Sequence, residues 1–107
     1  MSRPVVIIPA CTKEIEGLTF DCVGRKYSAA VAEAAGCQPL IAPIGPGMSD
    51  VAGLLAIADG ILLSGSLSNV APEHYSDEAP LKPQSLDPLR DALTLPLIRA
   101  AVEVKKP

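Results

Sequence analysis

A short apolar run that ends in a glycine turn places the strongest limit on the fold. Residues 59–75 read DGILLSGSLSNVAPEHY, in which Ile61, Leu62 and Leu63 form an uninterrupted apolar run. Such a run is typical of a strand buried on both faces of a parallel sheet. Ligands of open parallel sheets bind outside the carboxyl ends of the strands, so any chemistry is expected in the polar segment 64–69. The simpler interpretation of Ser-Gly-Ser is a turn that ends a strand.

The first part of the chain alternates between strand and helix patterns. PVVIIP at residues 4–9 and CQPLIA at residues 37–42 are predicted strands, and Pro39 in the second favours an edge position or a start at Leu40. Residues 10–20 are predicted to be a polar loop. A helix over 21–35 follows, with Asp21 as N-cap and Gly36 as C-cap. Its expected core stripe is Val23, Tyr27, Ala30, Val31 and Ala34.

The second part repeats the alternation and then adds a long connection. Ser49 is the predicted cap of a short helix over 50–57, and a strand over 60–63 follows. Residues 64–86 form a long irregular segment, which in a small domain is either functional or disordered. Asp87-Pro88 predicts the start of a last helix that reaches about Val104, with a kink at Pro96. The apolar face expected for this helix comprises Leu93, Leu97, Ala100, Ala101 and Val104.

The order strand, helix, strand, helix, strand, loop, helix predicts an α/β fold: a three-layer, doubly wound parallel sheet. The handedness and adjacency rules predict the strand order 2-1-3, with residues 4–9 in the centre. The last helix should lead to a fourth strand, but the sequence ends at Pro107, where that strand would begin. We therefore expect residues 1–107 to be a single partial domain, truncated after the third strand and its following helix.

Composition excludes several classes of function. The net charge is −3 with no basic run, which argues against a nucleic-acid surface. No apolar stretch has the length of a membrane span, and no signal peptide is evident, so the expected compartment is the cytoplasm. Cys11, Cys22 and Cys37 are odd in number and lack zinc-site spacing, so each is expected to be a free thiol. Neither a metal site nor a cofactor site is predicted.

Four segments in sequence order carry a resemblance to a known family. They are RPVVIIPAC from Arg3, VGRKYSAAVAEAAG from Val23, DGILLSGSLSNVAPEHY from Asp59 and DPLRDALTLPLIRAA from Asp87. With these segments the chain resembles the N-terminal half of a class I glutamine amidotransferase-like hydrolase. The most similar subgroup is the gamma-glutamyl-gamma-aminobutyrate hydrolase (peptidase C26) family. The resemblance implies a flavodoxin-like fold and a small gamma-glutamyl substrate.

The resemblance assigns a role to Gly65. In the family the glycine turn after the third strand contributes a backbone N–H to the oxyanion hole, which stabilises charge that develops during acyl transfer. The family's nucleophilic cysteine lies in a G-x-C-x-G pattern after a fourth strand, and that pattern does not occur here. Cys11 and His74 do not match the family's catalytic positions. The resemblance therefore implies that this chain is inactive alone.

The polar residues around Gly65 have two interpretations. Ser64, Ser66, Ser68 and Asn69 could hydrogen-bond a substrate carboxylate or amine, or they could only form the turn. For Cys11 a reactive thiol is the less favoured reading, because the only nearby basic residue is Lys13. For His74 an ordinary surface position is favoured over a metal or catalytic role.

Three functions stay open at this point. The chain is a truncated, inactive piece of a gamma-glutamyl hydrolase, one half of a split enzyme, or a self-associating interaction module. An apolar third strand without a fourth strand beside it favours pairing with another chain. We therefore expect a homo-oligomer that forms through the exposed third strand and the last helix.

Overall fold

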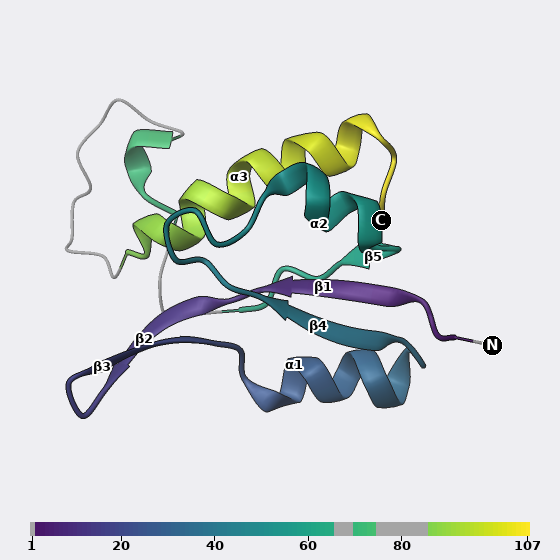
Figure 1. Ribbon diagram of the computed structural model, residues 1–107, viewed down its shortest axis with the longest axis horizontal. Coiled ribbons are helices and arrows are strands. Elements are labelled where there is room, and N and C mark those ends of the chain that lie inside the picture. The colour runs from purple at the N-terminus through teal and green to yellow at the C-terminus, as the bar shows by residue number, and fades with distance from the viewer. Residues whose placement is uncertain (1, 66–69, 75–85) are drawn as a thin grey trace.

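The central sheet is parallel and has the predicted strand order. The computed structural model describes residues 2–65, 70–74 and 86–107 (Figure 1). In it, β1 (Val5–Pro9) lies between β4 (Gln38–Ala42) and β5 (Gly60–Ile61), and both neighbours run parallel to it. The predicted order 2-1-3 is confirmed, and so is the edge position of the strand that contains Pro39.

Helices cover both faces of this sheet. The helix α1 (Arg25–Ala29) continues as a π-helical segment, η1 (Ala30–Ala34), on one face. On the other face lie α2 (Val51–Ile57) and α3 (Pro88–Glu103), as Figure 1 shows. The predicted three-layer α/β architecture is therefore confirmed.

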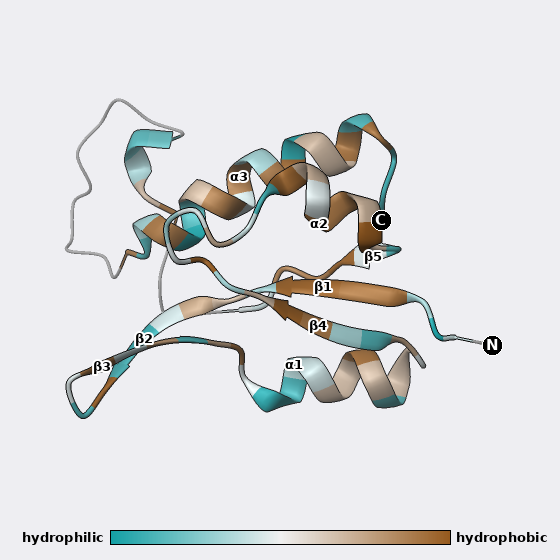
Figure 2. Ribbon diagram, in the orientation of Figure 1, coloured by the Kyte–Doolittle hydropathy of each residue, from teal (hydrophilic) through white to brown (hydrophobic). Residues whose placement is uncertain are grey.

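The core lies between β1 and the helices. Ile7 and Ile8 of β1 are 2% and 0% exposed, and Leu97 of α3 is 0% exposed. Burial of an aliphatic side chain of this size contributes about 1.5–3 kcal/mol. Figure 2 shows the same distribution, with apolar residues along β1. The apolar run at residues 4–9 of the sequence therefore forms the central strand.

The segment after β1 differs from the prediction. Residues 10–20 were expected to be a polar loop, but β2 (Cys11–Ile15) and β3 (Leu18–Cys22) form an antiparallel hairpin. Glu16 and Gly17, between the strands, have φ values of 52° and 78°. Two successive residues with positive φ are typical of a type I′ turn, whose twist matches that of paired strands. The turn therefore allows the backbone N–H and C=O groups of this polar sequence to pair with each other in a two-stranded ladder.

The helix after this hairpin begins later than predicted. Gly24, not Asp21, is its N-cap, because Asp21 lies in β3. The Asp21 carboxylate instead accepts hydrogen bonds from the backbone N–H groups of Ile44 and Gly45, each at 3.2 Å. This contact fixes the loop that follows β4.

Only part of the predicted stripe of this helix is buried. Val31 is buried, and Val23 and Tyr27 are half-buried, whereas Ala30 and Ala34 are exposed. The reason is the π-helical turn, which shows an i to i+5 hydrogen bond from the Ala35 N–H to the Ala30 carbonyl. A wider turn changes the helical period, so the spacing assumed for an α-helix no longer holds.

The cap of α2 also differs from the prediction. Asp50 rather than Ser49 is the N-cap, and its carboxylate accepts from the Gly53 N–H at 3.2 Å. The Ser49 hydroxyl donates to the Pro43 carbonyl instead.

The predicted start and most of the predicted apolar face of the last helix are confirmed. Its N-cap is Asp87, and the helix runs through Pro96. Leu93, Leu97 and Ala101 are buried, but Val104 is 59% exposed because it lies just past the helix end.

The third strand is shorter than predicted, and its outer edge is partly occupied. β5 ends at Ile61, so Leu62 and Leu63 follow the strand. The Ile61 N–H donates to the carbonyl of Pro107 at 2.8 Å, which corrects the expectation of a free edge at this residue. Leu63 remains 46% exposed.

No helix among residues 2–65, 70–74 and 86–107 is both long and apolar enough to cross a membrane.

Candidate functional site

The first turn of α3 joins the carboxyl ends of two strands. The Asp87 carboxylate accepts from the Thr12 N–H at 2.7 Å and from the Thr12 hydroxyl at 3.0 Å, just beyond β1. The same carboxylate accepts from the Arg90 N–H at 3.2 Å, which caps α3. Asp87 is 6% exposed. One buried carboxylate therefore ties the start of the helix to the edge of the sheet where parallel α/β folds bind ligands.

Arg90 makes the corresponding contact with the segment after β5. Its guanidinium Nη2 donates to the backbone carbonyl of Ser64, a residue that is itself 6% exposed. A hydrogen bond from a charged donor is stronger than one between neutral groups. The peptide between Ser64 and Gly65 is thus held from the α3 side of the sheet.

Tyr27 of α1 lies against the same peptide. A Cβ atom at Gly65 would lie 2.6 Å from the Tyr27 hydroxyl oxygen, so only glycine fits without a shift of that ring. The glycines with positive φ in the described residues are Gly17, Gly36 and Gly47. Gly65 is not among them, so the lack of space beside Tyr27, and not an unusual backbone angle, requires glycine here. Gly65 is exposed, and its backbone is open to a ligand.

A second acidic residue, Asp91, extends the site along α3. Asp91 is 3% exposed, and its carboxylate accepts from the Ala71 N–H at 3.0 Å. His74, in the short 3-10 helix η2 (Pro72–His74), places its Nε2 atom 3.8 Å from an Asp91 carboxylate oxygen. A cavity of about 160 Å³ adjoins this turn. Its lining residues are Leu63, Val70, Arg90, Asp91, Thr94, Leu95 and Ile98.

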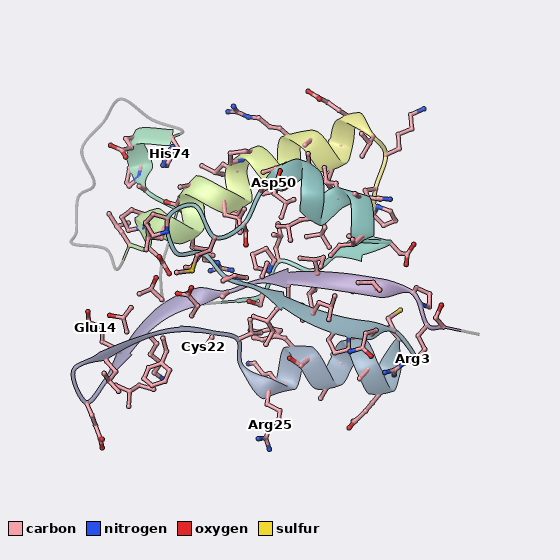
Figure 3. All side chains as sticks on the ribbon, in the orientation of Figure 1. Arg3, Glu14, Cys22, Arg25, Asp50 and His74 are labelled. Carbon is pink, nitrogen blue, oxygen red and sulfur yellow. The ribbon has the colours of Figure 1, made fainter. Side chains whose placement is uncertain are left out.

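The predicted site residues have different outcomes. Ser64 and Gly65 lie at the expected end of the third strand, and Ser64 contacts Arg90 through its backbone. Ser66, Ser68 and Asn69 lie outside the described residues. Figure 3 shows His74 beside α3 and Cys22 at the end of β3, well apart from each other. Within the described part of the chain, no three side chains of His, Cys, Asp or Glu gather into a possible metal site.

Sequence reasoning missed the residues that hold this site together. Asp87 was predicted only as a helix cap, while Arg90, Asp91 and Tyr27 were assigned no site role. A signal was present: Asp87, Arg90 and Asp91 put three charges at the start of a helix that carries no further charge until Arg99. Charged residues on a helix that packs on a sheet need partners, and the nearest backbone groups are those at the strand ends.

Comparison with known proteins decides the family. The family model for peptidase C26 matches residues 4–107. The chain belongs to the peptidase C26 family. The predicted resemblance is therefore confirmed at the level of the family.

Named relatives in this family agree with the match. The chain is 34% identical to a gamma-glutamyl-gamma-aminobutyrate hydrolase of Escherichia coli O157:H7 and 33% identical to the hydrolase PuuD of Escherichia coli K12. It is 32% identical to the corresponding hydrolase of Shigella flexneri. Each alignment covers all 107 residues of the chain but only 41% of the relative. As a peptidase C26 member, the chain thus spans about two fifths of the length of these relatives.

Proposed function

We propose that this chain forms one wall of the active site of a cysteine-dependent hydrolase of gamma-glutamyl amides. The observation that carries the proposal is the Ser64–Gly65 peptide at the carboxyl end of the third strand. It lies between Arg90 of α3 and Tyr27 of α1, and Gly65 is open to a ligand. A fixed backbone N–H of this kind can stabilise the negative charge that develops on a carbonyl oxygen during acyl transfer.

The proposed reaction needs groups that this sequence does not supply. In the mechanism, a thiolate attacks the gamma-glutamyl carbonyl carbon, and the leaving amine departs to give an acyl-enzyme that water then hydrolyses. The family's G-x-C-x-G pattern is absent from the 107 residues. The thiolate, its base and the orienting carboxylate would come from a further segment or from a second chain. Gly65 would supply one oxyanion donor, and Ser64, Ser66, Ser68 and Asn69 remain candidates for substrate contacts.

A chimera tests this proposal. Residues 1–107 would replace the aligned part of the Escherichia coli K12 relative, and hydrolysis of gamma-glutamyl-gamma-aminobutyrate would be measured. We expect turnover by the chimera and none by the 107-residue chain alone, because loss of a nucleophile or base lowers the rate by several orders of magnitude. A well-folded chimera with no activity would contradict the proposal.

The isolated chain needs its own control for Cys11. If the purified chain hydrolysed the substrate and Cys11→Ser abolished that activity, Cys11 would be a nucleophile and the proposed division of roles would be wrong. Mixing the chain with the remaining part of the relative as a separate polypeptide tests the split-enzyme alternative. Activity that appears only on mixing would favour it.

Self-association is a second candidate function, supported by exposed apolar side chains beside the third strand. Leu63 is 46% exposed and Ile98 is 37% exposed, and both line the cavity next to Arg90. Val102, further along α3, is 72% exposed. We propose a homo-oligomer in which Leu63, Ile98 and Val102 of one copy contact the same residues of a second copy. Exposed apolar surface of this kind marks protein–protein interfaces.

Light scattering on dilute protein tests the homo-oligomer. We expect the mass of an oligomer for the unmodified chain and a monomer mass for Leu63→Lys. Met48→Lys changes another exposed apolar residue, 66% exposed against 46% for Leu63, in the loop before α2 and serves as the control. A monomer before any substitution would contradict this candidate.

A further inference from the structure

The contact between Arg90 and Ser64 joins two segments that are far apart in sequence. Arg90 is in the first turn of α3, and the carbonyl that it contacts lies 26 positions earlier, just past β5. Arg90 is half-buried and Ser64 is buried, so water competes little for this hydrogen bond.

The geometry of a peptide bond extends the effect of this contact to Gly65. The described residues contain no cis peptide bond, and in a trans peptide the C=O and N–H groups point in opposite directions. Arg90 holds the Ser64 carbonyl, so the Gly65 N–H of the same rigid plane points away from Arg90. Tyr27 lies against Gly65, and its hydroxyl limits movement of the Gly65 Cα toward α1.

We propose that Arg90 is a positioning residue that aims and polarises the Gly65 N–H as an oxyanion donor. This inference rests on the function proposed above, in which Gly65 supplies that donor. The positive charge on the guanidinium draws electron density toward the Ser64 oxygen, and a polarised peptide is a stronger N–H donor on its other side. Arg90 therefore acts through the peptide without touching the substrate.

Nuclear magnetic resonance on the 107-residue chain tests whether Arg90 orients and polarises the Ser64–Gly65 peptide. Arg90→Met removes the donor but keeps an unbranched stem, and Arg99→Met changes an exposed arginine of the same helix as the matched control. We expect Arg90→Met to move the Ser64 carbonyl carbon and Gly65 amide resonances and to speed hydrogen exchange at Gly65. Arg99→Met should leave these signals in place.

Arg90→Lys is a second variant that allows the same test if Arg90→Met does not fold. Lysine keeps the charge and the stem but lacks the planar fork of donors, so we expect shifts at Gly65 in the same direction, of smaller size. Unchanged Ser64 and Gly65 signals in either folded Arg90 variant would overturn the inference.

Kinetics of the chimera test whether Arg90 supports the Gly65 N–H as an oxyanion donor. For Arg90→Met we expect kcat to fall roughly 10- to 100-fold, less than the roughly 100- to 1,000-fold seen when an oxyanion donor is removed, because the Gly65 N–H is weakened and not lost. KM should stay within about twofold, because the substrate is not contacted. A rise in KM at constant kcat would instead make Arg90 a substrate-binding residue and overturn the inference.

The resonance measurements and the chimera kinetics test this inference separately from the function on which it rests. If the unmodified chimera is inactive, the proposed function fails, and the resonances still decide whether Arg90 orients the Ser64–Gly65 peptide. If the chimera is active and the Arg90 variants match the Arg99→Met control, the proposed function stands and the inference fails.

Discussion

The segments that follow β1 and β5 start at the same edge of the sheet but are held in different ways. After β1, the chain forms the β2–β3 hairpin, which satisfies its backbone with its own antiparallel ladder. After β5, Ser64 and Gly65 lie between single side chains of two helices, Arg90 and Tyr27. The first segment is ordered by local backbone pairing, and the second by long-range side-chain contacts.

This difference determines where substitutions should matter. A ladder hydrogen bond uses backbone atoms, so it survives most changes of exposed side chains. A strand end held by one guanidinium and one aromatic ring loses its order when either side chain changes. The segment after β5 is thus the more sensitive of the two, which agrees with the proposal that its backbone N–H is held in place as a donor.

Asp87 connects the two segments through α3, because it bonds Thr12 after β1 and caps the helix whose Arg90 holds Ser64. Its loss should have the largest effect. Asp87→Ala removes the cap of α3 and leaves the Thr12 N–H without its partner. A lost cap costs about 1 kcal/mol and an unsatisfied buried donor about 1–3 kcal/mol, so we expect the free energy of unfolding to fall by roughly 2–4 kcal/mol. Urea denaturation measures this value.

Asp50→Ala is the matched control for Asp87→Ala. Asp50 caps α2 in the same way but is exposed. Its removal should lower the free energy of unfolding by only about 1 kcal/mol. Equal losses for the two substitutions would mean that the Asp87–Thr12 contact adds no stability.

Gly65→Ala should have the next largest effect. The new Cβ would lie 2.6 Å from the hydroxyl oxygen at the tip of the half-buried Tyr27 side chain, which can move aside, so we expect a loss of about 1 kcal/mol, the low end for overpacking. Tyr27→Phe removes that oxygen, so the loss should be smaller when both substitutions are combined. A double-mutant cycle by urea denaturation measures the coupling, which we expect to exceed about 0.5 kcal/mol. Strictly additive losses would show that Tyr27 and Gly65 do not meet.

Much of the fold follows from the sequence because local and long-range signals agree. The apolar runs at residues 4–9 and 37–42 predict buried strands, and parallel pairing follows from the length of their connection. Asp87-Pro88 predicts the start of α3, because the aspartate caps the helix and proline suits its first turn. In each case the residues that form the element also determine its position.

The misses come from features that the sequence pattern does not encode. The hairpin turn at Glu16-Gly17 is not one of the strong Asn-Gly or Asp-Gly signals, so the polar residues around it resembled a loop. The π-helical turn after α1 alters the period on which the predicted stripe depended. The contact of Arg90 with Ser64 is long-range and ends on a backbone atom, and no spacing rule predicts it.

The turn of the hairpin allows a smaller, local test. Gly17 has a φ of 78°, which a residue with a Cβ adopts only with strain. We expect Gly17→Ala to lower the free energy of unfolding by about 1 kcal/mol. Gly17→Asn should cost less, because asparagine tolerates this region better. Urea denaturation of the two variants tests this order, and equal losses would contradict it.

The exposed face of the hairpin should give the smallest effect of all. Phe20 of β3 is 41% exposed, and its backbone is paired with Lys13 of β2. Phe20→Thr keeps a residue that favours strands and leaves the ladder intact, so the free energy of unfolding should change by no more than about 0.5 kcal/mol. Hydrogen exchange at Gly65 should not change, because the strand end after β5 is held by different contacts. A loss above about 2 kcal/mol would mean that this face is packed against another surface in solution. Packing against that surface, in addition to the backbone ladder, would then order the hairpin.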